Sequence, residues 1–217
     1  MTIRYWFIRF MARLIFAGPF RWRHYNRDRV PLSGGVILAA NHASFLDPPL
    51  VGAAVQRPVC FLARESLFKG WGMKTLLRSC NAYPLDRDEG SAKGLSRMIQ
   101  FLREGQCVLL FPEGTRSPDG RVQPVRPGLG FIMALAKVPV VPIRVFGTYE
   151  ALNRHSRWPR FRRISVKFGH ALRFDKLTQA SQNTDKHQKK LIYQQISKEI
   201  MAAIEALEPH ADVTRFP

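Results

Sequence analysis

The sequence predicts an α/β fold: a three-layer single domain with a largely parallel central sheet flanked by helices, preceded by an N-terminal amphipathic helical arm. Short apolar stretches alternate along the chain with segments of helical periodicity, which is the pattern of parallel sheets with helices on both faces. The chain has 217 residues and 46% hydrophobic content, enough for one sizeable core. A separate apolar stripe at the N-terminus comes before the first predicted strand. We therefore expect an arm at residues 1–27 and one domain at residues 28–217.

The N-terminal arm is both apolar and basic. Its first 27 residues contain six arginines and no acidic residue. A stretch of about 14 residues is too short to cross roughly 30 Å of hydrocarbon. This composition favours a helix lying in the headgroup layer of an anionic membrane, and a helix packed on its own domain is the alternative. The apolar residues with helical spacing are Ile3, Trp6, Phe7, Phe10, Met11, Leu14 and Ile15.

Strands and helices are then expected in alternation. Asp47 and Pro48 mark a helix start, and Gly105 marks a helix stop. Alternation predicts an edge strand near a basic rim at 160–174, and a polar connector follows at 178–188. The predicted strands are 34–42, 59–63, 82–87, 106–111 and 138–146, and the predicted helices are 47–55, 72–80, 91–105, 128–137 and 190–207.

The charge calls for an anionic partner. Lys and Arg number 34 against 16 Asp and Glu, a formal net charge of +18. Nucleic acid, anionic lipid and an acidic carrier protein would each qualify. Nucleic acid is disfavoured because the basic residues are dispersed and no known nucleic-acid-binding signature occurs. Cys60, Cys80 and Cys107 are odd in number and widely separated, so we expect neither disulfides nor a metal site.

The stretch "NHASFLDPP" contains the first candidate site. His42 and Asp47 are five residues apart, a spacing that puts them on different faces of a regular helix or strand. If the strand ends at His42 and the helix begins at Asp47, the turn can fold the carboxylate against the imidazole. The histidine would then be oriented as a general base. In the other interpretation, Asp47 is a helix cap and His42 an incidental loop residue.

A second candidate follows the apolar strand 106–111, in "FPEGTRSPDG". Open α/β sheets bind ligands at the carboxyl ends of their strands. Gly114 permits close backbone approach, Thr115 offers a hydroxyl, and Arg116 can hold a phosphate. A plain turn is the alternative. The stretch "YPLDR" adds Arg87 at the end of another strand, where an ordinary surface ion pair is the simpler interpretation.

Four stretches together resemble a known family. "NHASFLD", "YPLDR", "FPEGTRS" and "VPVVPI", in this order and spacing, resemble the four motif blocks of the glycerolipid acyltransferases. The resemblance is to the bacterial 1-acyl-sn-glycerol-3-phosphate acyltransferases in particular. It covers roughly residues 30–175, and "FLARESLFKG" and "FGTYEAL" are also similar to that family.

The resemblance implies direct transfer of a fatty acyl group from an acyl thioester to the free hydroxyl of lysophosphatidic acid, giving phosphatidic acid. His42 would be the general base and Asp47 its orienting partner. The donor would be acyl-CoA or acyl carrier protein, acting as a co-substrate, and no cofactor is implied. An acyl-enzyme is not expected, because no G-x-S-x-G elbow occurs and Cys107 lies within a strand.

The resemblance also assigns substrate-binding residues. Arg87 and Arg116 would hold the acceptor phosphate, with Arg64 a further candidate at a position where relatives often have lysine. Glu113 and Gly114 would shape the glycerol site. The enzyme would work at the cytoplasmic face of the membrane, as a peripheral or interfacial protein.

Other activities are compatible with the same residues. An acyl-thioester hydrolase could use His42 and Asp47 to activate water. An acyltransferase for another lysolipid or an amino-acid lipid would need only a different acceptor site.

Overall fold

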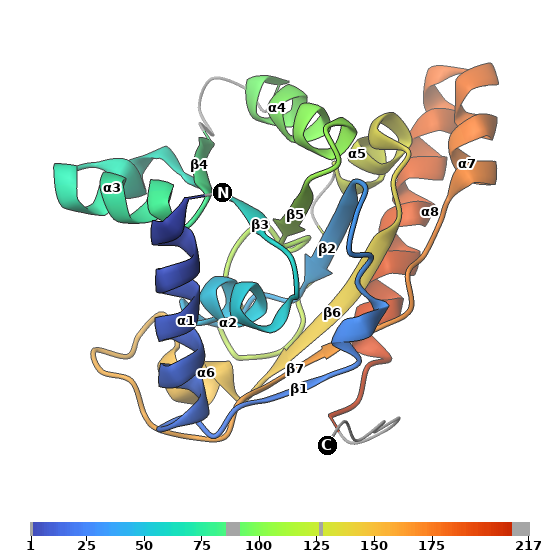
Figure 1. The fold of residues 1–217 in the computed structure, drawn as a ribbon. Helices are drawn as coiled ribbons and strands as arrows, with labels where there is room; N and C mark the ends of the chain where they lie inside the picture. Colours follow the sequence, from blue (N-terminus) through green and yellow to red (C-terminus); the bar gives the residue numbers. More distant parts are fainter. Residues whose placement is uncertain (1, 86–91, 126–127, 210–217) are drawn as a thin grey trace.

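The computed structural model describes residues 2–85, 92–125 and 128–209. A twisted sheet forms the middle layer, and helices cover both of its faces (Figure 1). The predicted three-layer α/β domain is confirmed.

The sheet is largely parallel. Within the described residues its strands are β1 (Arg23–Tyr25), β2 (Val36–Ala40), β3 (Val59–Arg64), β4 (Ala82–Leu85), β5 (Cys107–Leu110), β6 (Val140–Phe146) and β7 (Ser165–Phe168). Their order across the sheet is β1-β7-β6-β2-β5-β3-β4. Only β6 and β7 pair in antiparallel fashion. Strands β2 to β6 therefore point the same way and bring their carboxyl ends to one edge.

Helices α1 and α2 pack on one face of the sheet, and α4, α5 and α8 pack on the other. The helices of the described residues are α1 (Ile3–Ala17), α2 (Asp47–Ala54), α3 (Trp71–Ser79), α4 (Ala92–Arg103), α5 (Leu129–Ala136), α6 (Thr148–Leu152), α7 (Asp175–Ala180) and α8 (Lys186–Glu205). Short 3-10 turns occur at η1 (Arg27–Arg29), η2 (Glu65–Phe68) and η3 (Ser181–Asn183).

Strand β2 lies at the centre of the sheet and is buried along its whole length. Val36 and Leu38 join the core on the α2 side, whereas Ile37 and Ala39 join the core formed with α4, α5 and α8. A strand that is covered on both faces has no polar alternation. This is why the unbroken apolar run "VILAA" predicted it.

Helix α1 exposes a stripe of apolar side chains on its outer side. Arg9 and Arg13 point inward and donate hydrogen bonds to carbonyl groups at the C-terminal end of α2. Those carbonyls have no partner within their own helix, so the arginines cap α2. The exposed large apolar side chains of α1 are Ile3, Trp6, Phe7, Phe10, Met11, Leu14 and Ile15. None of the helices in the described ranges combines the length and apolar content needed to cross a bilayer.

Two predictions for the C-terminal half are wrong. Strand β7 is not at the edge of the sheet, because β1 pairs outside it. An alternating strand looks the same in sequence whether or not another strand covers its outer side. The expected connector at 178–188 contains part of α7, the η3 turn and the start of α8. The Asp185 carboxylate accepts the backbone N–H groups of two following residues and caps α8.

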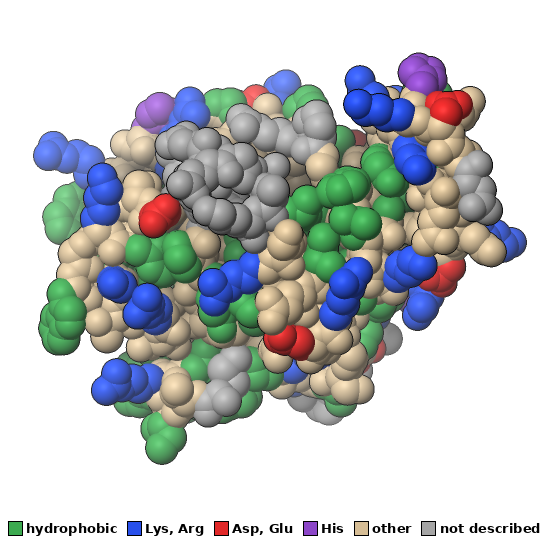
Figure 2. All heavy atoms as spheres, turned by 90° about the horizontal axis from the view of Figure 1, so that it is seen from above, with side chains coloured by type: hydrophobic (Ala, Val, Ile, Leu, Met, Phe, Trp, Pro, Cys, Tyr) green, Lys and Arg blue, Asp and Glu red, His purple; other side chains and the backbone are tan. Residues whose placement is uncertain are grey.

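Basic side chains are spread over the surface. In Figure 2, which looks down on the helices drawn at the top of Figure 1, Lys and Arg side chains outnumber Asp and Glu. They stand apart from one another among hydrophobic and uncharged groups. The surplus of 34 Lys and Arg over 16 Asp and Glu is thus not confined to one patch.

Candidate active site

The carboxyl end of β2 leads directly into the turn that carries the histidine and the aspartate. Strand β2 ends at Ala40, and α2 begins at Asp47. The Asn41 side chain extends the pairing with β6, since its Oδ1 accepts the Val145 N–H at 2.8 Å. The turn therefore leaves the sheet at the edge where open α/β sheets bind their ligands.

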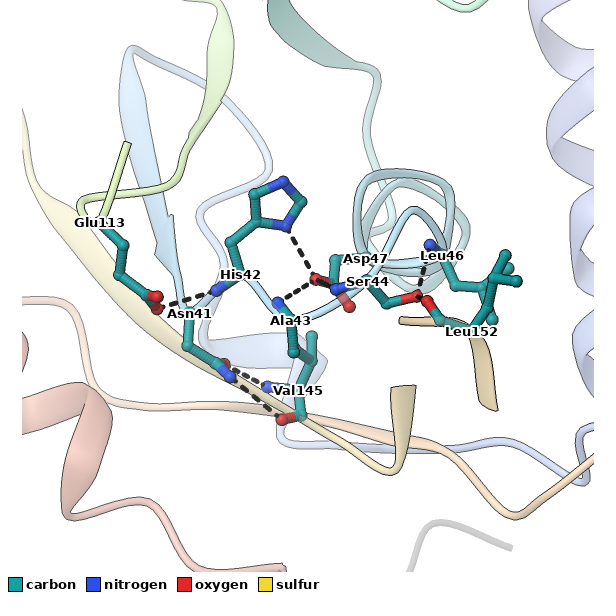
Figure 3. Close-up of polar contacts among 9 residues, drawn as sticks. All are labelled: Asn41, His42, Ala43, Ser44, Leu46, Asp47, Glu113, Val145 and Leu152. Carbon is teal, nitrogen blue, oxygen red and sulfur yellow. Dashed lines mark hydrogen bonds and ion pairs between the residues drawn. The ribbon is translucent and has the colours of Figure 1, made fainter. Parts of the chain in front are cut away.

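The turn folds the aspartate back against the imidazole (Figure 3). His42 Nδ1 lies 2.9 Å from Asp47 Oδ2, and the same oxygen accepts the N–H groups of Ala43 and Ser44, each at 2.7 Å. Asp47 is fully buried, and the His42 side chain is 17% exposed. The other ring nitrogen points away from the carboxylate. This is the geometry that the turn hypothesis predicts and the helix-cap alternative does not require.

Local bonds explain why the turn has this shape. Ser44 Oγ accepts the Leu46 N–H at 3.0 Å and donates to the Leu152 carbonyl at 2.5 Å. Pro48 lies in the first helical turn, where a missing N–H leaves no helical bond unmade. Side chains within the motif therefore supply most of the bonds that hold it.

Glu113, from the segment after β5, holds the backbone of the histidine. Its Oε1 accepts the His42 N–H at 2.9 Å, and Glu113 is only 2% exposed. The Ser117 N–H donates to the His42 carbonyl at 2.7 Å. Both peptide groups of His42 are thus bound by one segment, and "NHASFLD" and "FPEGTRS" form a single structural unit.

The Glu113 carboxyl titrates in the neutral range. Burial raises its pKa to about 7, against the lowering effect of the His42 N–H that it accepts. The nearby Asp47 carboxylate also raises the pKa of Glu113. A group that changes charge near neutral pH therefore lies directly behind the His42 backbone.

An apolar cavity of about 430 Å³ lies beside the histidine. The Phe111 ring stacks on the His42 imidazole, with ring centroids 3.9 Å apart and 19° between the planes. Phe111 also lines the cavity, whose other walls come from α1, α2, β3, η2, α3 and β5. The lining side chains include Ile8, Pro49, Phe61, Leu67, Leu76 and Cys80. An apolar chain in this cavity would have one end near the imidazole.

The loop after β5 brings a guanidinium over the histidine turn. The Arg116 guanidinium carbon lies 3.5 Å from the ring centroid of Phe45, and Phe45 also lines the cavity. Gly114 has φ of +66°, so the tight turn there uses the left-handed region that suits glycine. Thr115 is exposed. Of the residues predicted in this loop, the buried glutamate and the exposed threonine thus lie in different environments.

Two predicted phosphate-binding residues are not placed by the structure. Arg64 ends β3, but its side chain is outside what the structure describes. Strand β4 ends at Leu85, and Arg87 lies outside the described residues. Among the described residues, no three His, Cys, Asp or Glu side chains gather as metal ligands would.

Some residues of the site were not predicted. Phe111 was included in an apolar strand and Phe45 was given no role, because neither the spacing nor the chemistry of a phenylalanine distinguishes a cavity wall from a core position. The inward side of α1 was also missed as a cavity wall. Its stripe predicted an amphipathic helix but not what its other side would touch.

A histidine oriented by a buried carboxylate, next to an apolar cavity and the Arg116 guanidinium, is an arrangement suited to general-base chemistry on a substrate with an apolar chain. Residues 21–146, more than half of the chain, match the family model described as Acyltransferase. The chain belongs to this acyltransferase family.

Individual relatives carry more specific names. The chain is 28% identical over 119 residues to the 1-acyl-sn-glycerol-3-phosphate acyltransferase of Bacillus subtilis, a match covering 54% of this chain and 59% of that protein. It is 27% identical over 152 residues to the enzyme of the same name from Streptococcus pneumoniae, covering 69% and 54% of the two chains. The chain therefore spans somewhat over half the length of these relatives.

The fold also has a solved counterpart. The crystal structure of the 1-acyl-sn-glycerophosphate (LPA) acyltransferase from Thermotoga maritima superimposes with a TM-score of 0.66 and 23% identity. The superposition covers 96% of this chain and 85% of that one. Helices, sheet and their connections thus follow an arrangement known from crystallography.

Proposed function

We propose that this protein is an acyltransferase that moves a fatty acyl group from an acyl thioester to the free hydroxyl of 1-acyl-glycerol-3-phosphate, giving phosphatidic acid for phospholipid synthesis. The observation that carries the proposal is the 2.9 Å contact between His42 Nδ1 and the buried carboxylate of Asp47, beside an apolar cavity. The names of the relatives support the choice of acceptor.

The histidine acts as the general base. With Nδ1 held by Asp47, the other ring nitrogen takes the proton of the acceptor hydroxyl as its oxygen attacks the thioester carbonyl. The tetrahedral intermediate collapses, the carbon–sulfur bond breaks, and the thiolate receives the proton from the imidazolium. The products are an ester and a free thiol. Asp47 stabilises the imidazolium between the two proton transfers, and a positioned histidine contributes about 10²- to 10⁴-fold in rate.

The cavity is suited to the acyl chain of the donor. Its volume of about 430 Å³ lies within the usual range of ligand pockets, and nearly all of its lining is apolar. Phe111 connects the cavity to the histidine, because its ring lines the cavity and stacks on the His42 imidazole. A chain bound along this wall has its carbonyl end next to the base. Acyl-CoA and acyl carrier protein would both deliver such a chain.

The loop after β5 is suited to the acceptor. The Arg116 guanidinium lies over the ring of Phe45, and Phe45 belongs to the turn that carries His42. A guanidinium can form two parallel hydrogen bonds with a phosphate. We assign Arg87 and Arg64 to the same phosphate by their family motifs, and Thr115 as a hydroxyl donor at the loop surface. Gly114 lets the backbone approach the glycerol, while Glu113 acts behind it through the His42 backbone.

The protein works as a peripheral protein on the cytoplasmic face of an anionic membrane. Helix α1 supports this proposal because it exposes an apolar stripe while Arg9 and Arg13 point inward, unlike a helix made to face water. A formal net charge of +18 would add attraction to acidic lipids.

The test is acyl transfer by the purified protein, with lysophosphatidic acid and other lysolipids as acceptors, acyl-CoA and acyl carrier protein as donors, and mass spectrometry of the products. His42→Ala should lower transfer at least about 100-fold. His170→Ala, which removes an exposed histidine, is the matched control and should have no effect.

Three other outcomes would redirect the proposal. Transfer that survives His42→Ala would remove the mechanism. Free fatty acid formed at the same rate without acceptor would identify a thioester hydrolase. Selective acylation of another lysolipid or of an amino-acid lipid would keep the mechanism and change the acceptor.

A further inference from the structure

Residues 153–163 form an exposed segment without helix or strand between α6 and β7. The sequence "NRHSRWPRFRR" contains five arginines and no acidic residue. All five guanidinium-bearing residues are exposed. A segment with one sign of charge and no internal counter-charge is suited to an anionic surface outside the chain.

Two large aromatic residues stand among these arginines. Trp158 is 81% exposed and Phe161 is 67% exposed. Single exposed apolar residues are common, but an indole and a phenyl ring within one arginine-rich segment are not explained by solubility. Aromatic rings at headgroup depth with basic groups on lipid phosphates are the usual composition of membrane-contacting segments.

The segment lies beside the end of α1. The ring centroids of Phe161 and Phe20 are 5.4 Å apart, and the Ile164 N–H donates to the Phe20 carbonyl at 3.3 Å. In Figure 1 the segment loops out next to the lower end of α1. The segment therefore lies next to the C-terminal end of α1, the helix that carries the exposed apolar stripe.

The segment is also attached to the active-site turn. Leu152, the residue before it, accepts the Ser44 hydroxyl at 2.5 Å. The Arg160 N–H donates to the Ala151 carbonyl at 2.7 Å and holds the middle of the segment against α6. A short series of hydrogen bonds thus connects the segment to the turn that carries His42.

We propose that residues 153–163 are a second membrane contact, which binds anionic lipid and, together with α1, sets the orientation of the protein on the bilayer. This inference rests on the proposed membrane-surface function and adds a new site to it. Trp158 and Phe161 insert among the headgroups, and the arginines bind lipid phosphates. One helix alone leaves rotation about its axis free, whereas two contacts at the active-site edge hold the site toward its lipid substrate.

Vesicle binding tests the proposal without turnover if all variants carry His42→Ala. Arg157→Ala with Arg160→Ala should weaken binding to vesicles containing phosphatidylglycerol roughly 25-fold, about fivefold for each arginine. Lys186→Ala with Lys190→Ala, which removes the same charge from exposed sites on α8, should change binding less than about twofold, because these lysines would not reach the bilayer surface. On purely zwitterionic vesicles the two pairs should behave alike.

Tryptophan fluorescence tests the insertion directly. In a protein whose only tryptophan is Trp158, the others being replaced by phenylalanine, anionic vesicles should shift the emission to the blue, and brominated lipids should quench it. Placing the single indole on α8 by Lys190→Trp, with Trp158→Phe, should abolish both signals. Phe161 packs on Phe20, so Phe161→Ala could disturb folding. Trp158→Ser changes a side chain that is 81% exposed and tests insertion by vesicle binding, which it should weaken.

The results separate this inference from the proposed function. Unchanged vesicle binding by the arginine pair and an unshifted Trp158 would overturn the second contact while leaving the chemistry of His42 intact. If the arginine pair instead weakens binding of acidic acyl carrier protein and not of vesicles, the segment is a donor-docking site and the membrane assignment is wrong. Absence of acyl transfer by the protein with His42 intact, together with weakened vesicle binding by the arginine pair, would overturn the proposed chemistry and leave the second membrane contact standing.

Discussion

The turn at residues 41–47 and helix α1 both direct charged side chains inward, but they differ in what their other side chains face. In the turn, Asp47 is fully buried, and its Oδ2 accepts three bonds from the residues around it. In α1, arginines are turned inward to cap another helix, and the apolar residues face outward. The turn is explained by bonds within the chain. The outer side of α1 has no such bonds among the described residues and is suited to the membrane contact proposed for it.

The difference separates two kinds of function. The turn has no need of a partner to hold its shape, as a preorganised catalytic group requires. Arg9 and Arg13 bind helix α1 to the rest of the protein, and its apolar outer side stays exposed, as the proposed membrane contact requires. The cavity lies between them, since both α1 and Phe111 line it.

The sharpest way to break this comparison is Asp47→Asn. An amide has no charge to stabilise the imidazolium, and its NH2 group can point a donor at the backbone donors of Ala43 and Ser44. We expect kcat to fall about 10³- to 10⁴-fold, as when an orienting aspartate is lost from a triad. Asp175→Asn, at an exposed ion pair with Arg173, is the control and should leave kcat unchanged. A kcat within tenfold of the parent would mean that the carboxylate only shapes the turn.

Glu113→Gln tests whether the buried Glu113 carboxyl makes the stability of the protein depend on pH. The pKa of Glu113 is raised from 4.5 to about 7 by burial, so the charged form is disfavoured in the folded protein. The folded protein binds this proton more tightly than the unfolded chain does. The resulting contribution to the free energy of unfolding is complete below about pH 4.5, is lost as pH rises through 7, and amounts to about 3 kcal/mol. The variant should lack this part of the pH dependence, as urea unfolding between pH 4 and 8 would report.

Glutamine keeps an oxygen that can accept the His42 N–H, so acyl transfer by Glu113→Gln should stay within about tenfold of the parent. Glu199→Gln, an exposed change on α8, controls for the loss of one carboxylate. Parallel pH curves for the parent and Glu113→Gln would contradict the assignment of the slope to this residue.

The sequence predicted the parts of the fold and site that local patterns determine. The apolar run "VILAA" and the acid before Pro48 carried the information for β2 and the start of α2. The fold-back of Asp47 onto His42 could be predicted because its bonds lie within seven residues. Nothing local distinguished the edge position expected for β7 from its actual place inside β1.

Contacts between distant segments could not be predicted in this way. The bond from Glu113 to the His42 backbone joins positions 71 residues apart, and no periodicity reports it. The stripe on α1 was visible, but the inward direction of Arg9 depends on where α2 ends in space. The sequence therefore predicted Glu113 as a site residue but not its contact with the His42 backbone.

Arg9→Met tests the inner side of α1. Arg9 is 6% exposed, and its guanidinium donates to the Val55 carbonyl at the C-terminal end of α2. Without this bond the carbonyl group would be buried without a partner. Loss of this bond should lower the free energy of unfolding by about 2 kcal/mol and speed amide exchange across α1. Arg4→Met, on the exposed side of the same helix, is the matched control and should change stability by less than about 0.5 kcal/mol. Equal effects of the two variants would mean that capping does not hold α1.

The smallest expected effect is at the cavity, where the two regions meet. A methyl group on Gly52 of α2 would lie 2.8 Å from Phe61 Cζ, and Phe61 lines the cavity. Because the contact is with the far end of a ring, the ring can move, and the cavity changes shape while the fold is kept. Gly52→Ala should lower kcat/KM about tenfold for the longest acyl thioester that is accepted and leave short donors unaffected. Gly72→Ala on α3, where a methyl group would meet nothing within 4 Å, is the control. A uniform loss over all chain lengths would indicate that the methyl group disturbs Asp47 through α2 and that this cavity does not hold the acyl chain.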